Sequence, residues 1–404
     1  MLDNLIDERR KKVERLESVQ EHGAYPARTK RTHTIGAFLE DFTESKEQEL
    51  KAILTGRLIS QRGQGGLTFL TLRDESGEVQ LVLNQDRAKN YDEITKLIDL
   101  GDFLEARGVP HTTKRGTESL LCDEVRVISK ALRPYPSEYY GIEDKEILLR
   151  QRYLDLLTHP ETKDLFYAKA RFWGAMRTML QEEGFLEVET PIVETMPGGA
   201  EAEPFTSHHN ALDTEVYLRI APELWLKKLM VAGYEKVFEI GRVFRNEGMS
   251  NEHLQDFTNL EFYWAYKDYQ ELMDFVEAMV KKTVEATTGE TVTRFGDHEL
   301  NWGADWTRYE YNDLFKEENG IDLENTNKEE LLAKARELNL EKITDDLGKG
   351  RLIDLIYKKT VRPKLIQPCF LINPPVEIEP LAKRMEHDPS RVERFQILAG
   401  GTEL

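Results

Sequence analysis

Hydrophobic and polar positions alternate along much of the first third of the chain. Between residues 52 and 86 the alternation is broken at "GQGG" and "ESGE", which predicts a meander of three strands. Residues 102–132, with their glycine-rich turns, predict about two more strands. A helical stretch lies near residues 92–100. Five short strands in about 80 residues are typical of a small closed barrel of the oligonucleotide-binding (OB) type.

The rest of the chain mixes helical and strand periods. Residues 163–185 predict a long amphipathic helix that stops at Gly184. A helical pair over residues 324–343 is expected outside the core. Because helices and strands do not strictly alternate, the predicted fold class is α+β, with a mostly antiparallel sheet flanked by helices. The other predicted elements are a helix over 269–289 and strands over 187–193 (ending at Pro191), 216–220, 236–246 and 258–266.

The length of 404 residues is sufficient for two or three domains. Two prolines in "RPYPSEYYG" (133–141) interrupt any regular element, so this stretch is predicted to be a linker. The predicted organisation is an N-terminal helix and barrel over residues 1–135, a linker over 136–150, and an α+β domain over 151–404.

Charge and composition exclude several classes of protein. A formal net charge of −19 excludes a basic coat that binds nucleic acid indiscriminately, although a local basic face could still bind one folded RNA. Cys122 and Cys369 form neither a metal motif nor a disulfide framework, as expected in a reducing cytosol. No apolar stretch approaches the length that spans a bilayer, and the N-terminal segment is not a signal peptide. We therefore expect a cytoplasmic location and no membrane contact. The basic run from Arg9 to Arg15 is expected to be a solvated helix face.

The segment "FRNEGMSNEHLQDFTNLEFY", from Phe244 to Tyr263, carries more charge than a core hairpin needs. If it joins two antiparallel strands, a period of two places Asn259, Glu261 and Tyr263 on one face. Arg245 suits capture of a carboxylate or phosphate, and the acids suit an ammonium group. The pattern therefore indicates a ligand that carries both charges, such as an amino acid, beside a polyphosphate. Residue spacing alone leaves open a surface ladder of ion pairs across two strands.

This segment resembles motif 2 of the class II aminoacyl-tRNA synthetases. Residues Gly184–Val193 ("GFLEVETPIV") resemble motif 1, and "PGGAEAEPFTSHHNALDTEVYLRIAPEL" and "RQRYLDLL" (Arg150–Leu157) resemble the lysyl branch nearly continuously. The resemblance covers essentially the whole chain. It implies an OB-fold anticodon-binding domain followed by a class II catalytic domain. It further implies activation of lysine with ATP, transfer to tRNA(Lys), and a homodimer formed through motif 1.

The resemblance also assigns roles residue by residue. Arg245 is implied to bridge the ATP α-phosphate and the lysine carboxylate, and is the one residue assigned to catalysis. The remaining implied roles are ATP binding by Glu247, His253 and Phe257; α-amino binding by Gly199 and Glu223; ε-ammonium binding by Glu261 and Tyr263; and anticodon binding by Arg57, Phe69 and Gln80.

Three departures from the family pattern limit the resemblance. Gln396 stands where the family has a glutamate that helps to bind Mg²⁺, while Glu403 matches the second metal ligand. Leu254 replaces a polar residue of the ATP loop. The chain ends at Leu404, before the position of motif 3, so a fragment that is inactive or impaired by itself is expected. A split gene, or a truncated synthetase-like protein that binds tRNA without catalysis, is the alternative.

Overall fold

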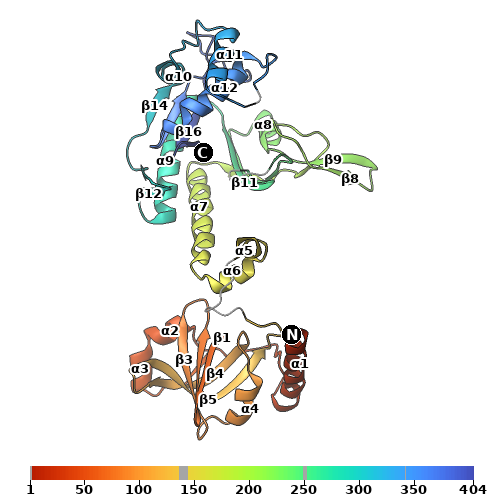
Figure 1. The fold of residues 1–404 in the computed structure, drawn as a ribbon, viewed down its shortest axis with the longest axis vertical. Coiled ribbons are helices and arrows are strands. Elements are labelled where there is room, and N and C mark those ends of the chain that lie inside the picture. The colour runs from red at the N-terminus through yellow and green to blue at the C-terminus, as the bar shows by residue number, and fades with distance from the viewer. Residues whose placement is uncertain (1, 136–143, 249–252, 342) are drawn as a thin grey trace. The chain divides into compact units, whose positions relative to one another are not determined.

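The computed structural model describes residues 2–135, 144–248, 253–341 and 343–404 (Figure 1). Within it the chain folds as two units, Met1–Pro160 and Glu161–Leu404. The predicted linker lies partly outside the described residues, because these omit 136–143. Its last six residues form the whole of α5 (Lys145–Arg150), which is followed by α6 (Arg152–Thr158).

The first unit contains a closed barrel with the strand order β1-β2-β3-β5-β4. Strand β3 pairs with β5 in parallel, and the other neighbours, including β1 and β4, pair antiparallel. The five strands and the helix near residues 92–100 confirm the predicted barrel. The elements are α1 (Leu2–Val19), α2 (Ile35–Glu40), α3 (Phe42–Glu47), β1 (Ala52–Gln64), β2 (Leu67–Arg73), β3 (Glu78–Asn84), α4 (Tyr91–Leu97), β4 (Phe103–Thr112) and β5 (Glu118–Ser129).

Burial alternates along the barrel strands, because successive side chains point to opposite faces of the sheet. Leu54, Leu58, Leu70 and Leu72 point inward and are at most 1% exposed. The outward positions between them are left available for contacts with other molecules.

The prediction of a fully solvated basic face on α1 is wrong at Arg9. Arg9 is 6% exposed and donates hydrogen bonds to the carbonyl oxygens of Ala131 (2.7 Å) and Arg133 (2.8 Å). Arg10 and Lys11 are exposed and pair with acids of their own helix, as expected. Arg9 therefore attaches α1 to the segment that follows β5.

In the second unit, two helices and a hairpin form a central core. Helix α7 ends where Gly184 takes a φ of +89°, which glycine adopts without steric cost. Phe185, Phe238 and Met279 are buried between α7, α9 and the hairpin of β10 and β11. The elements of this part are α7 (Thr162–Glu182), β6 (Leu186–Glu187), β7 (Val193–Glu194), β8 (Thr206–His209), β9 (Thr214–Leu218), α8 (Glu223–Val231), β10 (Lys236–Phe244), β11 (Asp256–Trp264) and α9 (Tyr269–Thr288).

The strand predicted over 187–193 is wrong in extent. Strand β6 has two residues, paired in parallel with β10, and β7 begins only at Val193, where it pairs with β9. Pro191 has no backbone N–H to donate to a ladder, which accounts for the interruption.

The remaining residues form a third region of the second unit, with its own hydrophobic core. Strand β14 pairs with β15 in parallel, and β15, β16 and β17 pair antiparallel. The expected helical pair over 324–343 is a single helix, α11, and Leu331 is fully buried in this core rather than outside it. The elements are β12 (Val292–Phe295), β13 (His298–Asn301), β14 (Thr307–Glu310), α10 (Tyr311–Asn319), α11 (Lys328–Glu337), α12 (Lys349–Thr360), a short 3-10 helix (Arg362–Lys364), β15 (Cys369–Ile372), β16 (Phe395–Ala399) and β17 (Thr402–Glu403).

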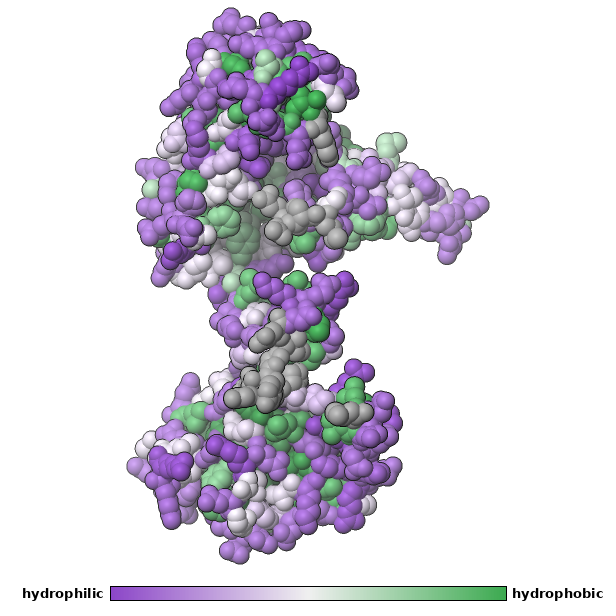
Figure 2. All heavy atoms as spheres, viewed as in Figure 1, coloured by the Kyte–Doolittle hydropathy of each residue, from purple (hydrophilic) through white to green (hydrophobic). Residues whose placement is uncertain are grey.

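On the face shown in Figure 2, hydrophilic residues predominate and hydrophobic side chains form small groups between them. Among the described residues, no helix is both long and apolar enough to cross a membrane.

Candidate active site

The two faces of the β10–β11 hairpin have different partners. Leu260, Phe262 and Trp264 pack with the core of α7 and α9. The alternate residues Glu261 and Tyr263 lie on the other face, where α8 packs against both strands (Figure 1). The Tyr263 hydroxyl donates a hydrogen bond to Glu261 Oε1 at 2.9 Å. The predicted placement of Glu261 and Tyr263 on one face is therefore confirmed.

Gly199 and Glu223 are also brought together. Gly199 has a φ of +90°, and a Cβ atom added to it would lie 2.8 Å from Glu223 Cβ. Both the backbone conformation and the available space therefore require glycine at this position. Glu223 begins α8, where a carboxylate is stabilised by the helix dipole.

Lys227 links these residues and was not found by sequence reasoning. Its Nζ lies 2.6 Å from Glu223 Oε1, one helical turn away, and 6.0 Å from the centre of the Tyr263 ring. Only the spacing of four residues between Glu223 and Lys227 could have indicated the contact, and that spacing is common on helix surfaces.

The pKa of Glu261 is raised above its ordinary value. Burial is the largest cause, and the charges of Glu223 and Glu239 raise it further, whereas the Tyr263 hydrogen bond and Lys227 lower it. Burial and the neighbouring Glu261 raise the pKa of Tyr263, so the hydroxyl remains a donor. The carboxylate and the hydroxyl form a half-buried acceptor site for a cation.

A buried ion pair lies beneath this site. Glu239 is the cross-strand partner of Glu261 and is 4% exposed. Arg219, which is 1% exposed, holds Glu239 through a 2.6 Å ion pair and also donates to the Thr190 hydroxyl at 3.0 Å. At Gly241, an added Cβ atom would lie 2.3 Å from Arg219 Nη2, so glycine leaves room for the guanidinium. The Arg219 guanidinium is therefore engaged by Glu239, and no ion pair joins it to Glu261 among the described residues.

Arg245 lies directly after β10 and contacts another predicted ATP residue. Its guanidinium carbon is 5.2 Å from the centre of the Phe257 ring. Arg245 Nε also donates to the carbonyl oxygen of Ile220 at 3.4 Å. Because Ile220 precedes Glu223 by three residues, one short segment connects the predicted phosphate and amino-acid residues.

The loop of the hairpin is described only in part, because 249–252 lie outside the described residues. Glu247 accepts a hydrogen bond from the backbone N–H of Glu203 at 3.3 Å, which attaches the loop to the segment before β8. His253 is exposed, and Leu254 is 67% exposed. The structure thus places Glu247 and His253 on the loop that follows Arg245.

The predicted metal residues lie on neighbouring strands. Gln396 on β16 donates from Nε2 to Glu403 Oε1 on β17 at 3.1 Å. In the part of the chain that the structure describes, no group of three or more His, Cys, Asp or Glu residues is arranged to hold a metal ion. The oxygen donors at this position are one carboxylate and one amide.

Arg57, Phe69 and Gln80 all point outward from the barrel. Phe69 is half-buried between inward Thr68 and Leu70, and Gln80 accepts a hydrogen bond from the Ser119 hydroxyl at 3.1 Å. Arg57 lies apart from them. Its guanidinium packs on Phe103 (4.3 Å) and Tyr135 (5.6 Å), and burial lowers its pKa.

Arg62 was missed by the sequence analysis and is the cross-strand partner of Phe69. It is exposed, so it presents a cation beside the Phe69 ring. The pair lies between a β-bulge at Leu58–Ser60 and the two-residue turn at Gly65 and Gly66, and this turn sets its register.

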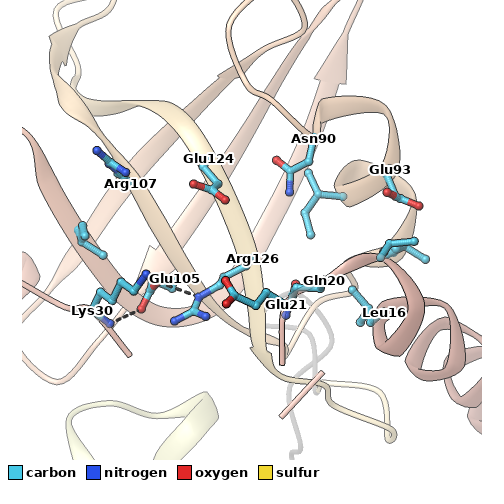
Figure 3. A pocket seen from close by; sticks show the side chains of 14 residues that line it. Leu16, Gln20, Glu21, Lys30, Asn90, Glu93, Glu105, Arg107, Glu124 and Arg126 are labelled. Carbon is cyan, nitrogen blue, oxygen red and sulfur yellow. Dashed lines mark hydrogen bonds and ion pairs between the residues drawn. The ribbon is translucent and has the colours of Figure 1, made fainter. Parts of the chain in front are cut away.

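A cavity of about 220 Å³ lies elsewhere on the first unit (Figure 3). Two of its charged groups pair with each other: Glu105 accepts from Arg126 Nε at 2.8 Å, and it also accepts from the Lys30 backbone N–H at 2.6 Å. None of the predicted anticodon residues lines it. The lining residues are Leu16, Val19, Gln20, Glu21, Lys30, Ile53, Asn90, Glu93, Ile94, Leu97, Glu105, Arg107, Glu124 and Arg126.

Comparison with known proteins identifies the family. A family model described as "tRNA synthetases class II (D, K and N)" matches residues 144–404, and one described as "OB-fold nucleic acid binding domain" matches residues 52–128. The chain is 39% identical to the lysine–tRNA ligase of Halalkalibacterium halodurans, over 100% of this chain and 81% of that protein. The chain belongs to the lysine–tRNA ligase family.

Two relatives from Escherichia coli K12 agree with this assignment. The heat-inducible lysine–tRNA ligase is 37% identical over 98% of this chain, and a second lysine–tRNA ligase is 37% identical over 99%. Each alignment covers 81% of the relative. The residues matched by the class II model include the β10–β11 hairpin and α8. The residues matched by the OB-fold model include Arg57, Phe69 and Gln80 on the outward face of the barrel.

Proposed function

We propose that this chain activates lysine with ATP to form lysyl-adenylate and transfers the lysyl group to the 3′ end of tRNA(Lys). Within it, residues 151–404 carry the chemistry and residues 1–135 bind the anticodon. The observation that carries the proposal is the half-buried group formed by Glu223 of α8 with Glu261 and Tyr263 of the hairpin that also presents Arg245.

The activation step needs no side-chain nucleophile. The lysine carboxylate attacks the α-phosphorus of ATP, a new O–P bond forms, and the bond to pyrophosphate breaks. Negative charge grows on the α-phosphate oxygens during this displacement, so a fixed guanidinium stabilises the transition state more than the ground state. Arg245 is suited to this role because its charge persists and its contacts with Phe257 and Ile220 hold it in place.

Specificity for lysine follows from the charge of the site. In our proposal, Glu223 and the backbone at Gly199 bind the α-ammonium, while Glu261 and Tyr263 bind the ε-ammonium. A neutral or acidic side chain would leave the half-buried Glu261 carboxylate without a partner, and a site built to bind a polar group rejects a ligand that lacks it.

The proposed reaction is tested by ATP–pyrophosphate exchange with each of the amino acids in turn. The assay uses the chain extended to the full length of the Halalkalibacterium halodurans relative, of which it covers 81%, and we expect exchange with lysine alone. The alternative, a protein that binds tRNA without catalysis, would bind tRNA(Lys) and show no lysine-dependent exchange. Exchange with aspartate or asparagine instead of lysine would contradict our assignment of Glu261 and Tyr263.

Magnesium would be held by Glu403, with Gln396 as a second oxygen donor, and would neutralise phosphate charge when bound with ATP. An amide is a weaker ligand than a carboxylate for this hard cation, and the Gln396 amide donates its N–H to Glu403. We predict that Gln396→Glu increases the affinity for Mn²⁺ about tenfold in the presence of ATP, measured by electron paramagnetic resonance. Gln367→Glu, on a glutamine that bonds Glu299 and Asn301 instead, is the matched control. An equal affinity for Mn²⁺ in the Gln396→Glu variant and the native chain would show that residue 396 is not a metal ligand.

Phe69, Gln80 and Arg62 are proposed to bind the anticodon, with Arg57 at the edge of the same outward face. An outward aromatic ring stacks on an unpaired base, and an amide and a guanidinium read its edge or bind its phosphate. The cross-strand position of Arg62 beside Phe69 supports this arrangement.

Phe69→Ala is predicted to weaken binding of tRNA(Lys) by about 1–3 kcal/mol, the usual contribution of one stacked base. Lysine-dependent exchange without tRNA should stay unchanged. Filter binding and exchange assays measure the two effects, and Leu50→Ala, at another exposed apolar residue of the first unit, is the control. Equal losses in both assays would show that Phe69 supports the barrel instead.

A homodimer formed through motif 1 is proposed from exposed apolar side chains. Leu165 and Phe166 on α7 are 66% and 52% exposed, and Val193 on β7 is 52% exposed. Leu165 and Phe166 lie on the helix that precedes the motif 1 segment, and Val193 lies at the end of that segment. Exposed apolar side chains of this kind favour burial against a second copy. Sedimentation equilibrium tests this, and a monomer at micromolar concentration would contradict it.

A cytoplasmic location is proposed because both cysteines are unpaired and buried, as in proteins of a reducing compartment. A fluorescent fusion that labelled only the cell envelope would contradict it.

A further inference from the structure

We propose that Lys227 is a tethered cation that occupies the substrate-ammonium site of the free protein, so that lysine binds by exchanging its α-ammonium for the Lys227 ammonium. The inference rests on the proposed lysine site and adds a residue to which that proposal gives no role.

The position of Lys227 supports this exchange. Its Nζ lies 2.6 Å from Glu223 Oε1, the oxygen donor proposed for the α-ammonium of lysine. The same ammonium lies 6.0 Å from the Tyr263 ring centre, and its charge acts on Glu261. A side chain of the protein thus makes the contact with Glu223 that is expected of the ligand's α-ammonium.

The charges of the site explain why a counter-ion is needed. Glu239 forms an ion pair with Arg219 at 2.6 Å, and Glu223 and Glu261 are two further carboxylates in one half-buried site. Burial is the main cause of the raised pKa of Glu261, and repulsion by the charges of Glu223 and Glu239 adds to it. One ammonium from Lys227 relieves part of this repulsion while the substrate is absent.

Exposure makes the contact reversible. The Lys227 side chain is 54% exposed, against 30% for Glu223, so its ammonium can move into water on its flexible stem. An exposed ion pair contributes little free energy, so a ligand can displace it. The neighbouring Lys228 is also exposed, but it lies over Trp225, with Nζ 4.1 Å from the ring centre.

If the ligand displaces Lys227 from Glu223, Lys227 should weaken the binding of only those ligands that carry an α-ammonium. Lysine must displace Lys227 from Glu223, whereas 6-aminohexanoate, which lacks the α-ammonium, can bind Glu261 and leave that pair intact. Lys227 therefore opposes lysine binding and leaves 6-aminohexanoate binding unchanged.

The test is calorimetric titration of both ligands at pH 8, where the carboxylates are ionised. Lys227→Met is expected to bind lysine about threefold more tightly than the native chain, the scale of one exposed ion pair. The gain should disappear in 1 M salt, which screens exposed charges. Lys227→Arg, which keeps the cation, should bind lysine as the native chain does, and Lys228→Met is the matched control on the same helix.

Lysine affinity that is unchanged or weaker in Lys227→Met would overturn the exchange, and so would equal gains for lysine and 6-aminohexanoate. Failure of the native chain to bind lysine would overturn the proposed function itself. An affinity for lysine that is the same with and without the Lys227 ammonium would overturn only this inference. The melting temperature of each variant shows whether a change in affinity comes from altered folding.

Discussion

Arg245→Ala is expected to reduce lysine-dependent ATP–pyrophosphate exchange by about a thousandfold, since removal of one fixed charge-stabilising group typically costs about 10²–10³ in rate. Arg245 lies on the loop side of β10, where its guanidinium contacts Phe257 and the carbonyl of Ile220. Its charge would stabilise the α-phosphate most strongly in the transition state. The loss should therefore appear mainly in kcat, with a smaller change in lysine KM.

Two further variants separate the role of charge from the role of shape. Arg245→Lys keeps the charge but not the planar fork, so partial activity is expected. Arg242→Ala is the matched control, because Arg242 lies three residues earlier, is exposed, and pairs with Asp256 at 3.1 Å. Native activity in Arg245→Ala would show that Arg245 does not stabilise the transition state of the reaction.

Glu261→Gln is expected to weaken lysine binding by about 2–3 kcal/mol, or roughly a hundredfold, the usual contribution of a hydrogen bond to a charged group. Glutamine preserves the shape of Glu261 and can still accept the Tyr263 hydroxyl, which now donates to Glu261 Oε1 at 2.9 Å. Only the counter-charge for the ε-ammonium is lost. ATP affinity should change little, and both affinities are measured by calorimetry.

Glu235→Gln is the control for this variant. Glu235 is exposed and directly precedes β10, at the end of the hairpin away from its loop. If Glu261→Gln lowers the melting temperature while lysine affinity holds, Glu261 is structural, and the case for lysine then depends on Glu223 and Tyr263.

The raised pKa of Glu261 gives the site a pH dependence of known sign. The side chains that contribute to the pKa of Glu261 belong to three elements. They are Tyr263 on its own strand, Glu223 and Lys227 on α8, and Glu239 on β10. Lysine binds the ionised form, so its affinity should fall as the pH decreases through the raised pKa, above the ordinary value of about 4.3. Glu261→Gln should lose this dependence.

Folding responds to the same group with the opposite sign. The folded chain binds the Glu261 proton more tightly than the unfolded chain, because the folded pKa is raised. The contribution of Glu261 to stability is therefore fully present below the ordinary pKa and is lost as the pH rises through the raised value. Denaturant titrations of the native chain and of Glu261→Gln across this range test the sign.

Local patterns of the sequence predicted the barrel and the β10–β11 hairpin, but not the strands β12 to β17 or the helices α10 and α12 of the third region. Period-two alternation predicted all five barrel strands and both strands of the hairpin, because successive strand residues face opposite sides. Gly184 and Gly289 end α7 and α9 with positive φ, as glycine allows. The same period placed Glu261 and Tyr263 on one face. The roles of Arg245 and Phe69 came from resemblance to the class II synthetases, because composition and spacing alone also allowed an ion-pair ladder and a core aromatic.

The tertiary structure alone decided which distant charges meet. Arg9 is buried against the carbonyls of Ala131 and Arg133, far along the chain, so a local pattern predicted it wrongly as solvated. Arg219 meets Glu239 only because β9 leads into α8 beside β10. Helical spacing allowed the Lys227–Glu223 pair, but only the packing of α8 on β11 brings it to Tyr263. Sequence period determines the face on which a side chain lies, whereas the charges it meets depend on contacts between segments that are distant along the chain.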